Sequence, residues 1–274
     1  MSKIDLRGAC VVLSGASSGI GYELSKLLCL KHQCRVIGLA RRREKLDVVK
    51  AELGDGFIPF VCDVTKEDDR LALLDFINKT SEKPDILFNN AGTLPPFSCF
   101  DADSAEELSH VMELNFHSHV KMCALFLPLL LDSPRGAIVN VASSAALATL
   151  PGTSAYCASK SALLAFTEAL SLEYGDSLFV AAVCPGMTAT ELFDSHEGAS
   201  LIDKFAPSAE RTAKKIIRRL RRGRKMIVTG ADAHIMSGLR RILGRGALRL
   251  FAAFVRAVRL PIFADTFYKK KETK

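Results

Sequence analysis

The sequence predicts an α/β fold, in which a doubly wound parallel sheet of about seven strands has helices on both faces. Short runs rich in Val, Ile and Leu alternate along the chain with longer segments of helical periodicity. Strands separated by helices of this length pair in parallel, because each helix carries the chain back across the sheet. The strand runs are continuously apolar rather than alternating, which is typical of parallel strands buried on both faces.

The expected elements succeed one another in chain order. Strands are expected at Cys10–Ser14, Arg35–Ala40, Gly56–Cys62, Asp85–Asn89, Ala137–Ala142, Leu178–Cys184 and Lys225–Thr229. Helices are expected at Gly19–Lys31, Arg43–Leu53, Lys66–Thr80, Ser104–Leu131, Ser154–Tyr174 and Ala209–Arg222. Pro128 should bend or stop the long helix that begins near Ser104. Residues 1–230 are thus predicted as one domain, and residues 231–274 as a basic, amphipathic helical extension.

Eight cysteines are spread singly along the chain, with no C-x-x-C pair. Free thiols in a reducing cytosol fit this spacing better than a disulfide framework or a zinc site. His117 and His119 are two residues apart and do not share a helix face, so no metal site is predicted. No signal peptide is recognised before the first strand, and a cytoplasmic location is expected.

The charge is divided unevenly along the chain, whose formal net charge is +7. Residues 209–274 carry 19 Lys and Arg against 4 Asp and Glu, while residues 1–208 carry 18 against 26. An acidic body with a strongly basic tail predicts an anionic partner that meets the tail.

A glycine-rich turn connects the first strand directly to the first helix. It consists of Ser14, Gly15, Ala16, Ser17, Ser18, Gly19, Ile20 and Gly21. Glycines let the backbone approach a pyrophosphate, and the helix N-terminus offers free N–H groups and a positive dipole end. Such a turn also occurs without a ligand, but its place in the first β-α-β unit favours a Rossmann-like, dinucleotide-binding fold.

The residues after the second strand indicate which dinucleotide binds. An acidic residue there would bind a free ribose 2′-hydroxyl. The chain instead continues Arg41-Arg42-Arg43 and reaches its first carboxylate at Glu44. Arginine suits a 2′-phosphate, whereas cations that merely begin a solvated helix would oppose its dipole. NADP(H) is therefore the predicted cofactor, with Arg41 and Arg42 as contacts and Arg43 as a solvated helix residue.

Tyr156 and Lys160 are four residues apart on an expected helix, so their side chains share one face. A phenol has a pKa of about 10, and a neighbouring cation favours the phenolate and moves the pKa toward neutrality. Ser143 lies thirteen residues before Tyr156, at the end of a strand, where its hydroxyl can fix a substrate oxygen against the phenol. The three residues predict a proton-transfer site for a carbonyl or an alcohol.

Together these residues resemble the short-chain dehydrogenase/reductase family over residues 8–230. The glycine turn is similar to the family's TGxxxGxG, with Ser14 in place of the usual Thr. Further matches are Cys62-Asp63-Val64, Asn89-Asn90-Ala91-Gly92, Asn115 on the long helix, and Pro185-Gly186-Met187-Thr188 after the sixth strand.

The resemblance implies a role for each residue in a catalytic domain. Tyr156 exchanges a proton with the substrate oxygen while a hydride passes between NADP(H) and the carbon. Lys160 lowers the pKa of Tyr156 and binds the nicotinamide ribose, Ser143 orients the substrate, and Asn115 holds a water beside Lys160. Ser144 is given a structural role. The implied cofactor contacts also include Asp63, Val64, Asn89, Ala91, Gly92, Pro185, Gly186, Met187 and Thr188.

The expected function is an NADPH-dependent oxidoreductase for a hydrophobic carbonyl/alcohol pair, such as a lipid, steroid, retinoid, or long-chain aldehyde or ketone. Two alternatives are an NADP(H)-binding adaptor with little turnover, and a non-redox activity such as an epimerase or dehydratase. Assembly as a homodimer or homotetramer is left open.

An apolar pocket could be lined by Leu94, Pro95, Pro96, Phe97, Leu147, Met187, Leu192, Phe193 and Phe205. Residues 188–207 are the expected mobile lid.

The basic tail predicts an amphipathic helix over Ile235–Leu260, which Gly244 and Gly246 could break into two pieces. Its arginines, at positions 241, 245, 249, 256 and 259, share one arc, and Leu243, Leu250, Phe251, Phe254, Val255 and Val258 cover the other side. This pattern indicates a helix lying in an anionic membrane interface, with Lys269–Lys271 adding attraction. The alternative is a helix packed on the body or at a subunit interface. Nucleic acid is disfavoured, because no recognition motif accompanies the charge.

Overall fold

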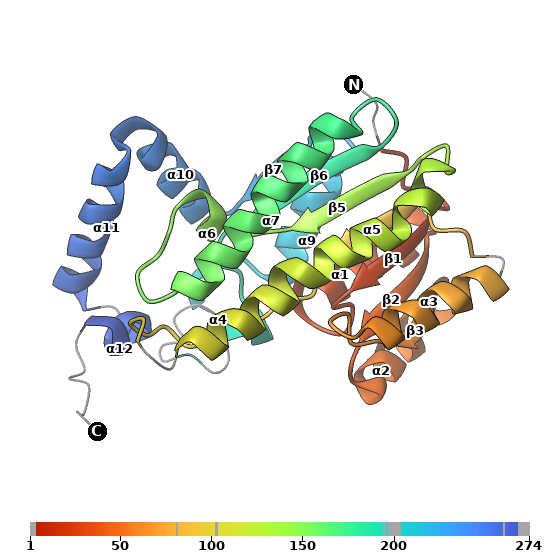
Figure 1. The fold of residues 1–274 in the computed structure, drawn as a ribbon, viewed down its shortest axis with the longest axis horizontal. Coiled ribbons are helices and arrows are strands. Elements are labelled where there is room, and N and C mark those ends of the chain that lie inside the picture. Colours follow the sequence, from red (N-terminus) through yellow and green to blue (C-terminus); the bar gives the residue numbers. More distant parts are fainter. Residues whose placement is uncertain are drawn as a thin grey trace.

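The computed structural model describes residues 4–267 apart from 81, 102–103, 194–195, 197–203 and 260. Seven strands form one parallel sheet in the order β3-β2-β1-β4-β5-β6-β7 (Figure 1), which confirms the predicted fold class. The strands are β1 (Cys10–Ser14), β2 (Arg35–Ala40), β3 (Phe57–Val61), β4 (Ile86–Asn89), β5 (Ala137–Val141), β6 (Phe179–Pro185) and β7 (Met226–Thr229).

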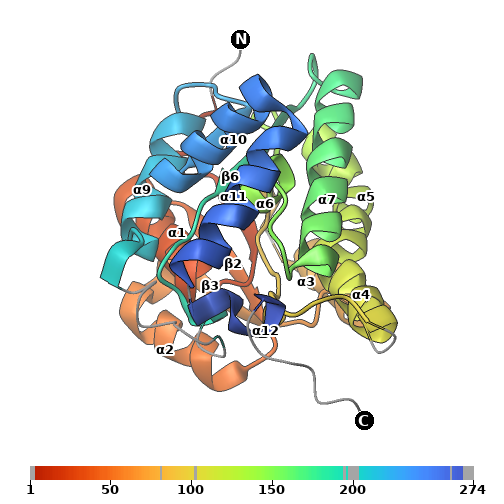
Figure 2. The ribbon, with the colours of Figure 1, turned by 90° about the vertical axis from the view of Figure 1, so that its left-hand side faces the viewer.

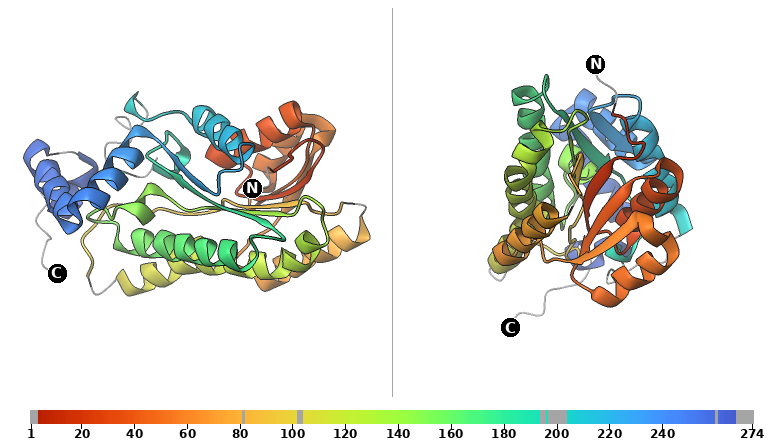
Figure 3. Two further views of the ribbon diagram at one scale, coloured as in Figure 1. Left: turned by 90° about the horizontal axis from the view of Figure 1, so that it is seen from above. Right: turned by 90° about the vertical axis from the view of Figure 1, so that its right-hand side faces the viewer.

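Helices cover both faces of the sheet, so the protein has three layers (Figures 2 and 3). One face is packed by α1 (Gly19–His32), α2 (Arg43–Leu53) and α9 (Ala209–Leu220), and the other by α3 (Glu67–Lys79), α5 (Ser118–Leu131) and α7 (Ser154–Glu173). Successive strand residues point to opposite faces, and each face therefore has its own apolar core.

The long helix expected at 104–131 contains a π-helical turn. The chain runs through α4 (Ser104–Met112), η2 (Glu113–His117) and α5 without leaving the helical path, and Pro128 lies in the last turn of α5. The segment is long and apolar enough to span a membrane by length and composition alone. Met122, Phe126 and Leu130 are instead fully buried against the sheet, which accounts for its apolar character.

Strands β2 and β3 are added on one side of β1, and strands β4 to β7 on its other side, so the switch point of the sheet lies between β1 and β4. In such sheets ligands bind at the carboxyl ends of the strands on either side of this switch point. In register, Ser14 of β1 lies beside Leu39 of β2, and Asn89 of β4 lies beside Asn140 of β5. The glycine turn, the arginines after β2 and Ser143 after β5 therefore emerge at the same edge of the sheet.

The C-terminal extension folds as two helices rather than one. These are α10 (Ala231–Leu243) and α11 (Arg245–Val258), and η4 (Pro261–Phe263) and α12 (Ala264–Phe267) come after them. The break falls at Gly244, whose combination of φ +54° and ψ −130° is readily adopted only by glycine. The two helices form a V at one end of the molecule, beside the short helix α6 (Ser144–Leu147) (Figures 1 and 2). Lys269–Lys271 lie outside the described residues.

Candidate active site

The glycine turn has the shape that a dinucleotide requires. Gly15 and Gly19 have φ values of +68° and +52°, and a Cβ on Gly21 would overlap the carbonyl oxygen of Gly15. The N-cap residue of α1, Ser18, makes no capping hydrogen bond with its side chain, so the first N–H groups of the helix have no side-chain acceptor there. This bare, close-packed helix start fits a pyrophosphate.

Two residues predicted to contact the cofactor have side chains that connect neighbouring strands. The Ser14 hydroxyl accepts hydrogen bonds from the backbone N–H groups of Asn90 (2.9 Å) and Ala91 (3.1 Å). The side chain of Asn89 is fully buried, and its amide donates to Oδ1 of Asn140 at 2.9 Å. Both side chains are therefore directed into the protein, where they hold β1, β4 and β5 together.

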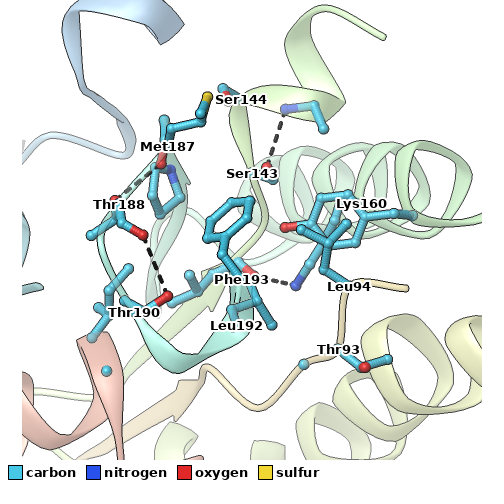
Figure 4. Close-up of a pocket in the computed structure, with 18 of the residues that line it drawn as sticks. Thr93, Leu94, Ser143, Ser144, Lys160, Met187, Thr188, Thr190, Leu192 and Phe193 are labelled. Atoms are coloured by element: carbon cyan, nitrogen blue, oxygen red, sulfur yellow. Dashed lines mark hydrogen bonds between the residues drawn. The ribbon is translucent and has the colours of Figure 1, made fainter. Parts of the chain in front are cut away.

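Ser143, Tyr156 and Lys160 line one cavity of about 350 Å³ together with Gly15, Ser18, Gly19 and Ile20 of the glycine turn. Ser143 comes after β5 and caps α6, since its hydroxyl oxygen accepts from the N–H of Ala145 at 3.1 Å. Figure 4 shows Ser143 and Lys160 on one side of this cavity and Thr188 and Thr190 on the other. The structure thus brings the predicted proton-transfer residues together beside the glycine turn.

Lys160 is buried at the floor of the site, where 4% of its surface is exposed. Its Nζ donates to the carbonyl oxygen of Val141 at 2.9 Å and lies 6.0 Å from the centre of the Tyr156 ring. Burial lowers the pKa of Lys160 to about 8, because the charged ammonium loses its hydration.

The expected lowering of the Tyr156 pKa is not found. Burial raises the pKa of this phenol to about 12, and an interaction with Ser143 offsets only part of the rise. The lower pKa was expected because Lys160 lies four residues from Tyr156 on the helix. In the structure, however, the ammonium of Lys160 donates its hydrogen bond to the carbonyl oxygen of Val141. At neutral pH the Tyr156 side chain is consequently a neutral phenol, which can donate its proton.

Asn115 lies in the π-helical turn and is fully buried. Its Oδ1 accepts from the N–H of Thr93 at 2.8 Å, and its Nδ2 donates to the carbonyl of Thr93 at 2.9 Å and to the hydroxyl of Ser159 at 3.2 Å. A Cβ on Gly92 would lie 3.1 Å from Asn115 Oδ1 and 3.4 Å from Lys160 Nζ. Asn115 therefore fixes the Gly92 loop beside Lys160, and its role toward a water stays a prediction.

The residues predicted for the adenosine half lie at the ends of β2 and β3. Arg41 and Arg42 are exposed, and a guanidinium nitrogen of Arg42 lies 3.8 Å from the carboxylate of Glu191. Asp63 accepts hydrogen bonds from the N–H and the hydroxyl of Thr65, and Val64 is buried. Both arginine side chains are exposed, but an anion at Arg42 would compete with the carboxylate of Glu191.

The loop after β6 is held by residues that sequence reasoning missed. Pro185, Gly186, Met187 and Thr188 line the cavity, and the N–H of Met187 donates to the carboxylate of Asp232 at 2.8 Å. Asp232 lies in the first turn of α10. No motif marks this aspartate, because its partner is 45 residues away in sequence.

The apolar part of the cavity was predicted in part. Leu94, Phe97, Met187, Leu192 and Phe193 line it as expected, and Leu150, Phe251 and Phe263 line it as well. Four candidates are outside it: Phe205 is 76% exposed, Leu147 packs on the cluster around Leu163, and Pro95 and Pro96 line a separate small hollow. Of the expected lid, residues 194–195 and 197–203 lie outside the described residues.

The sequence matches the family model for short chain dehydrogenases over residues 9–199. The chain belongs to the short-chain dehydrogenase family. Among curated relatives, the NADPH-dependent pterin aldehyde reductase of Arabidopsis thaliana is 33% identical over 201 residues, which are 73% of this chain and 83% of that protein. A benzil reductase of Saccharomyces cerevisiae is 34% identical over 193 residues, 68% of this chain and 73% of that protein.

Solved structures of short-chain dehydrogenases share the fold. One from Burkholderia cenocepacia in complex with NADP has a TM-score of 0.76 at 24% identity, with 89% of this chain and 99% of that chain covered. One from Sphingobium yanoikuyae in complex with NADPH has a TM-score of 0.73 at 24% identity, covering 90% and 96%.

Proposed function

We propose that this short-chain dehydrogenase is an NADP(H)-dependent oxidoreductase that interconverts a hydrophobic carbonyl compound and its alcohol. The observation that carries the proposal is one cavity that joins a glycine-rich helix start to Ser143, Tyr156 and Lys160 and continues into an apolar lining. Such a site can hold a dinucleotide and an apolar substrate side by side, with a proton donor between them.

In the carbonyl-reducing direction, each residue has a role that fits its charge state. NADPH, when bound, supplies the hydride. The hydroxyl of Tyr156, whose pKa is raised to about 12, donates its proton to the oxygen of the carbonyl as that oxygen becomes an alkoxide. Ser143 donates a hydrogen bond to the same oxygen, and Lys160, when charged, stabilises the phenolate that remains. Leu94, Phe97 and Phe193 exclude water from this exchange.

NADP(H) is the favoured dinucleotide because of the two arginines at the end of β2. Arg41 and Arg42 stand at the carboxyl edge of the sheet, and their guanidinium groups suit a 2′-phosphate. The pterin aldehyde reductase, whose name states NADPH dependence, is consistent with this choice.

NADPH oxidation tests the proposal. Purified protein should oxidise NADPH in the presence of long-chain aldehydes or benzil and should form the corresponding alcohol in equal amount. NADPH binding with no turnover across aldehydes, ketones and steroid ketones would favour the adaptor function. Product formation without net consumption of cofactor would favour an epimerase or dehydratase.

We also propose that the protein attaches to the cytoplasmic face of an anionic membrane through α10 and α11. Seven large apolar side chains on these two helices are exposed: Ile235, Leu239, Ile242, Leu243, Leu250, Phe254 and Val258. Ile235, Leu239 and Ile242 share one face of α10 by their spacing, and Leu250, Phe254 and Val258 share one face of α11.

The charge next to these faces supports an anionic lipid surface as the partner. Arg241, Arg249, Arg256 and Arg259 are exposed on the same two helices, and Asp232 is the one acidic residue of α10 and α11. Exposed apolar rows beside arginines describe a helix pair lying in a lipid surface with negative headgroups. The inner side chains Phe251 and Val255, predicted on the lipid side, pack against the body instead.

Sedimentation with phosphatidylserine vesicles tests this attachment. We expect the wild type to sediment with the vesicles at low salt and to be released only in part at high salt, because screening weakens the charges and not the apolar contacts. Ile242→Asp combined with Leu250→Asp should abolish sedimentation, while Leu30→Asp, an exposed leucine on α1, should not. No sedimentation of the wild type, with a change of mass in light scattering on truncation after Gly230, would assign α10 and α11 to a homodimer or homotetramer contact.

A further inference from the structure

We propose that the C-terminal extension forms the outer wall of the substrate pocket, and that Phe251 and Phe263 set the length and width of the apolar group that the enzyme accepts. This inference rests on the proposed function. It concerns residues that lie beyond the segment matched by the family model, which ends at residue 199.

The two phenylalanines belong to the same cavity as the proton-transfer residues. Phe251 projects from α11 and Phe263 from η4, and both line the cavity with Tyr156 and Ser143. Phe263 is 4% exposed and packs in a cluster with Leu94, Phe97 and Val255, against which Tyr156 also packs. The extension thus supplies a side of the pocket that the seven-stranded body leaves open.

A row of aromatic rings joins the extension to the far side of the pocket. The ring centre of Phe263 lies 6.2 Å from that of Phe251 and 5.2 Å from that of Phe97. Phe97 in turn lies 5.4 Å from His196, whose ring lies 5.5 Å from Phe193. Three of these contacts are edge-to-face and that of Phe193 with His196 is tilted, and such contacts stabilise the orientation of each ring. The wall is therefore continuous from α11 to the residues that come after β6.

Three anchors fix the extension to the loops beside the catalytic residues. Arg240 donates to the carbonyl oxygen of Leu147 at 2.8 Å, in the last residue of the helix that Ser143 caps. The thiol of Cys99 donates to the carbonyl oxygen of Thr266 at 3.2 Å. Gly152, four residues before Tyr156, has no room for a Cβ because the side chain of Thr266 packs against it. The wall is thus attached to the loops on both sides of the pocket.

This arrangement has a consequence for the substrate. An apolar chain or ring whose carbonyl oxygen reaches Tyr156 lies in the cavity that Phe251 and Phe263 line. Removing the ring of Phe251 would add space there, so longer or wider substrates would fit without strain. The phenylalanines would discriminate between substrates by size, as apolar pockets do. Each group that does not fit would lower kcat/KM by about tenfold or more.

Chain-length profiles of variants test the proposal. We would measure kcat/KM with NADPH for straight-chain aldehydes from butanal to dodecanal, without lipid, for the wild type, Phe251→Ala and Phe263→Leu. We expect the ratio of kcat/KM for dodecanal to that for butanal to rise about tenfold in Phe251→Ala. Phe254→Ala is the matched control, because its ring lies on the same helix but is exposed and outside the cavity. It should keep the wild-type profile.

A second measurement separates this inference from the proposed function. Calorimetric titration of the NADPH-loaded protein with octanol and dodecanol reports the pocket even if no aldehyde is reduced. Phe251→Ala should shift the ratio of the two dissociation constants toward dodecanol, with an unchanged NADPH affinity and a cooperative thermal transition as evidence of an intact fold. Equal ratios in the wild type, Phe251→Ala and Phe263→Leu would overturn the proposal. The wild type could bind the alcohols and reduce no carbonyl while the variants show altered ratios of the two dissociation constants. That result would overturn only the proposed function.

Discussion

The carboxylate of Asp232 accepts a hydrogen bond from the backbone N–H of Met187 at 2.8 Å. Met187 lies in the loop that the family resemblance assigns to the nicotinamide amide, and Asp232 lies in the first turn of α10. A Cβ on Gly186 would overlap this carboxylate, so the loop and the aspartate are in direct contact. The start of the extension therefore holds the loop that the resemblance assigns to the nicotinamide, while its later part lines the cavity.

Asp232→Ala should weaken NADPH binding and lower kcat. A hydrogen bond to a charged acceptor contributes about 1.5–3 kcal/mol, so we expect a loss of about tenfold or more in kcat divided by the NADPH dissociation constant. Asp232→Asn keeps an acceptor oxygen at the same position and should restore most of this loss. Fluorescence titration with NADPH and steady-state rates check both variants. If Asp232→Ala loses only thermal stability and keeps both constants, the aspartate does not position the loop.

Tyr156→Phe should leave NADPH binding nearly unchanged and remove most of the turnover. The substitution deletes the proton donor and keeps the ring that packs against Leu94 and Phe97. Lys160→Met should weaken both properties, because this residue is expected to contact the cofactor as well as stabilise the phenolate. A Tyr156→Phe rate above a few per cent of the wild-type rate would remove this tyrosine from the mechanism.

The pKa of Lys160 predicts how stability changes with pH. The unfolded side chain has a pKa of 10.5, and burial lowers it in the folded protein to about 8. Below pH 8 Lys160 is charged in both the folded and the unfolded protein, and the cost of burying this charge lowers the free energy of unfolding in full. Above pH 8 the folded protein binds fewer protons than the unfolded chain, so the free energy of unfolding rises with pH by up to about 1.4 kcal/mol per unit.

Lys160→Met lacks this titration and provides the reference. The difference in the free energy of unfolding between the wild type and Lys160→Met should grow in favour of the wild type from pH 8 to pH 9. Urea unfolding at several pH values measures it. A constant difference across this range would show that the folded lysine keeps its ordinary pKa.

The local features of the chain were enough to predict the sheet and the meeting of three candidate catalytic residues. β1, β2 and α2 have the expected boundaries, because each is an apolar run or a helical period ended by glycine or by a change of charge. Ser143, Tyr156 and Lys160 meet in the structure as their spacing implied.

Properties that depend on distant contacts could not be predicted in this way. Phe251 and Phe263 have the same local pattern as the exposed Phe254, and only the path of the chain back to Phe97 separates them. The pKa of Tyr156 was wrongly predicted for the same reason. The expectation counted the cation four residues away and not the burial that the whole pocket imposes.

The last prediction concerns Glu191, a residue of the expected lid whose carboxylate lies beside the predicted 2′-phosphate site. Its carboxylate is 3.8 Å from Arg42 and 2.7 Å from Nζ of Lys45, and it lines the cavity. A 2′-phosphate bound by Arg42 would lie near this negative charge and would compete with it for the guanidinium. Because such exposed ion pairs contribute about 0–1 kcal/mol, Glu191→Gln should tighten NADPH binding up to about fivefold. NADH binding should not change, since NADH has no 2′-phosphate.

Arg41→Ala and Arg42→Ala should have the opposite effect, weakening NADPH by about 1.5–3 kcal/mol and leaving NADH unchanged. Arg43→Ala is the control, because this arginine begins α2 and is expected to be solvated. Dissociation constants of NADPH and NADH for the wild type and all variants test whether these arginines bind the 2′-phosphate and whether Glu191 competes with it. Equal affinity of the wild type for NADH and NADPH would contradict the assignment of the arginines. An unchanged NADPH constant in Glu191→Gln, with the arginine effects present, would show that the lid carboxylate does not compete for the phosphate site.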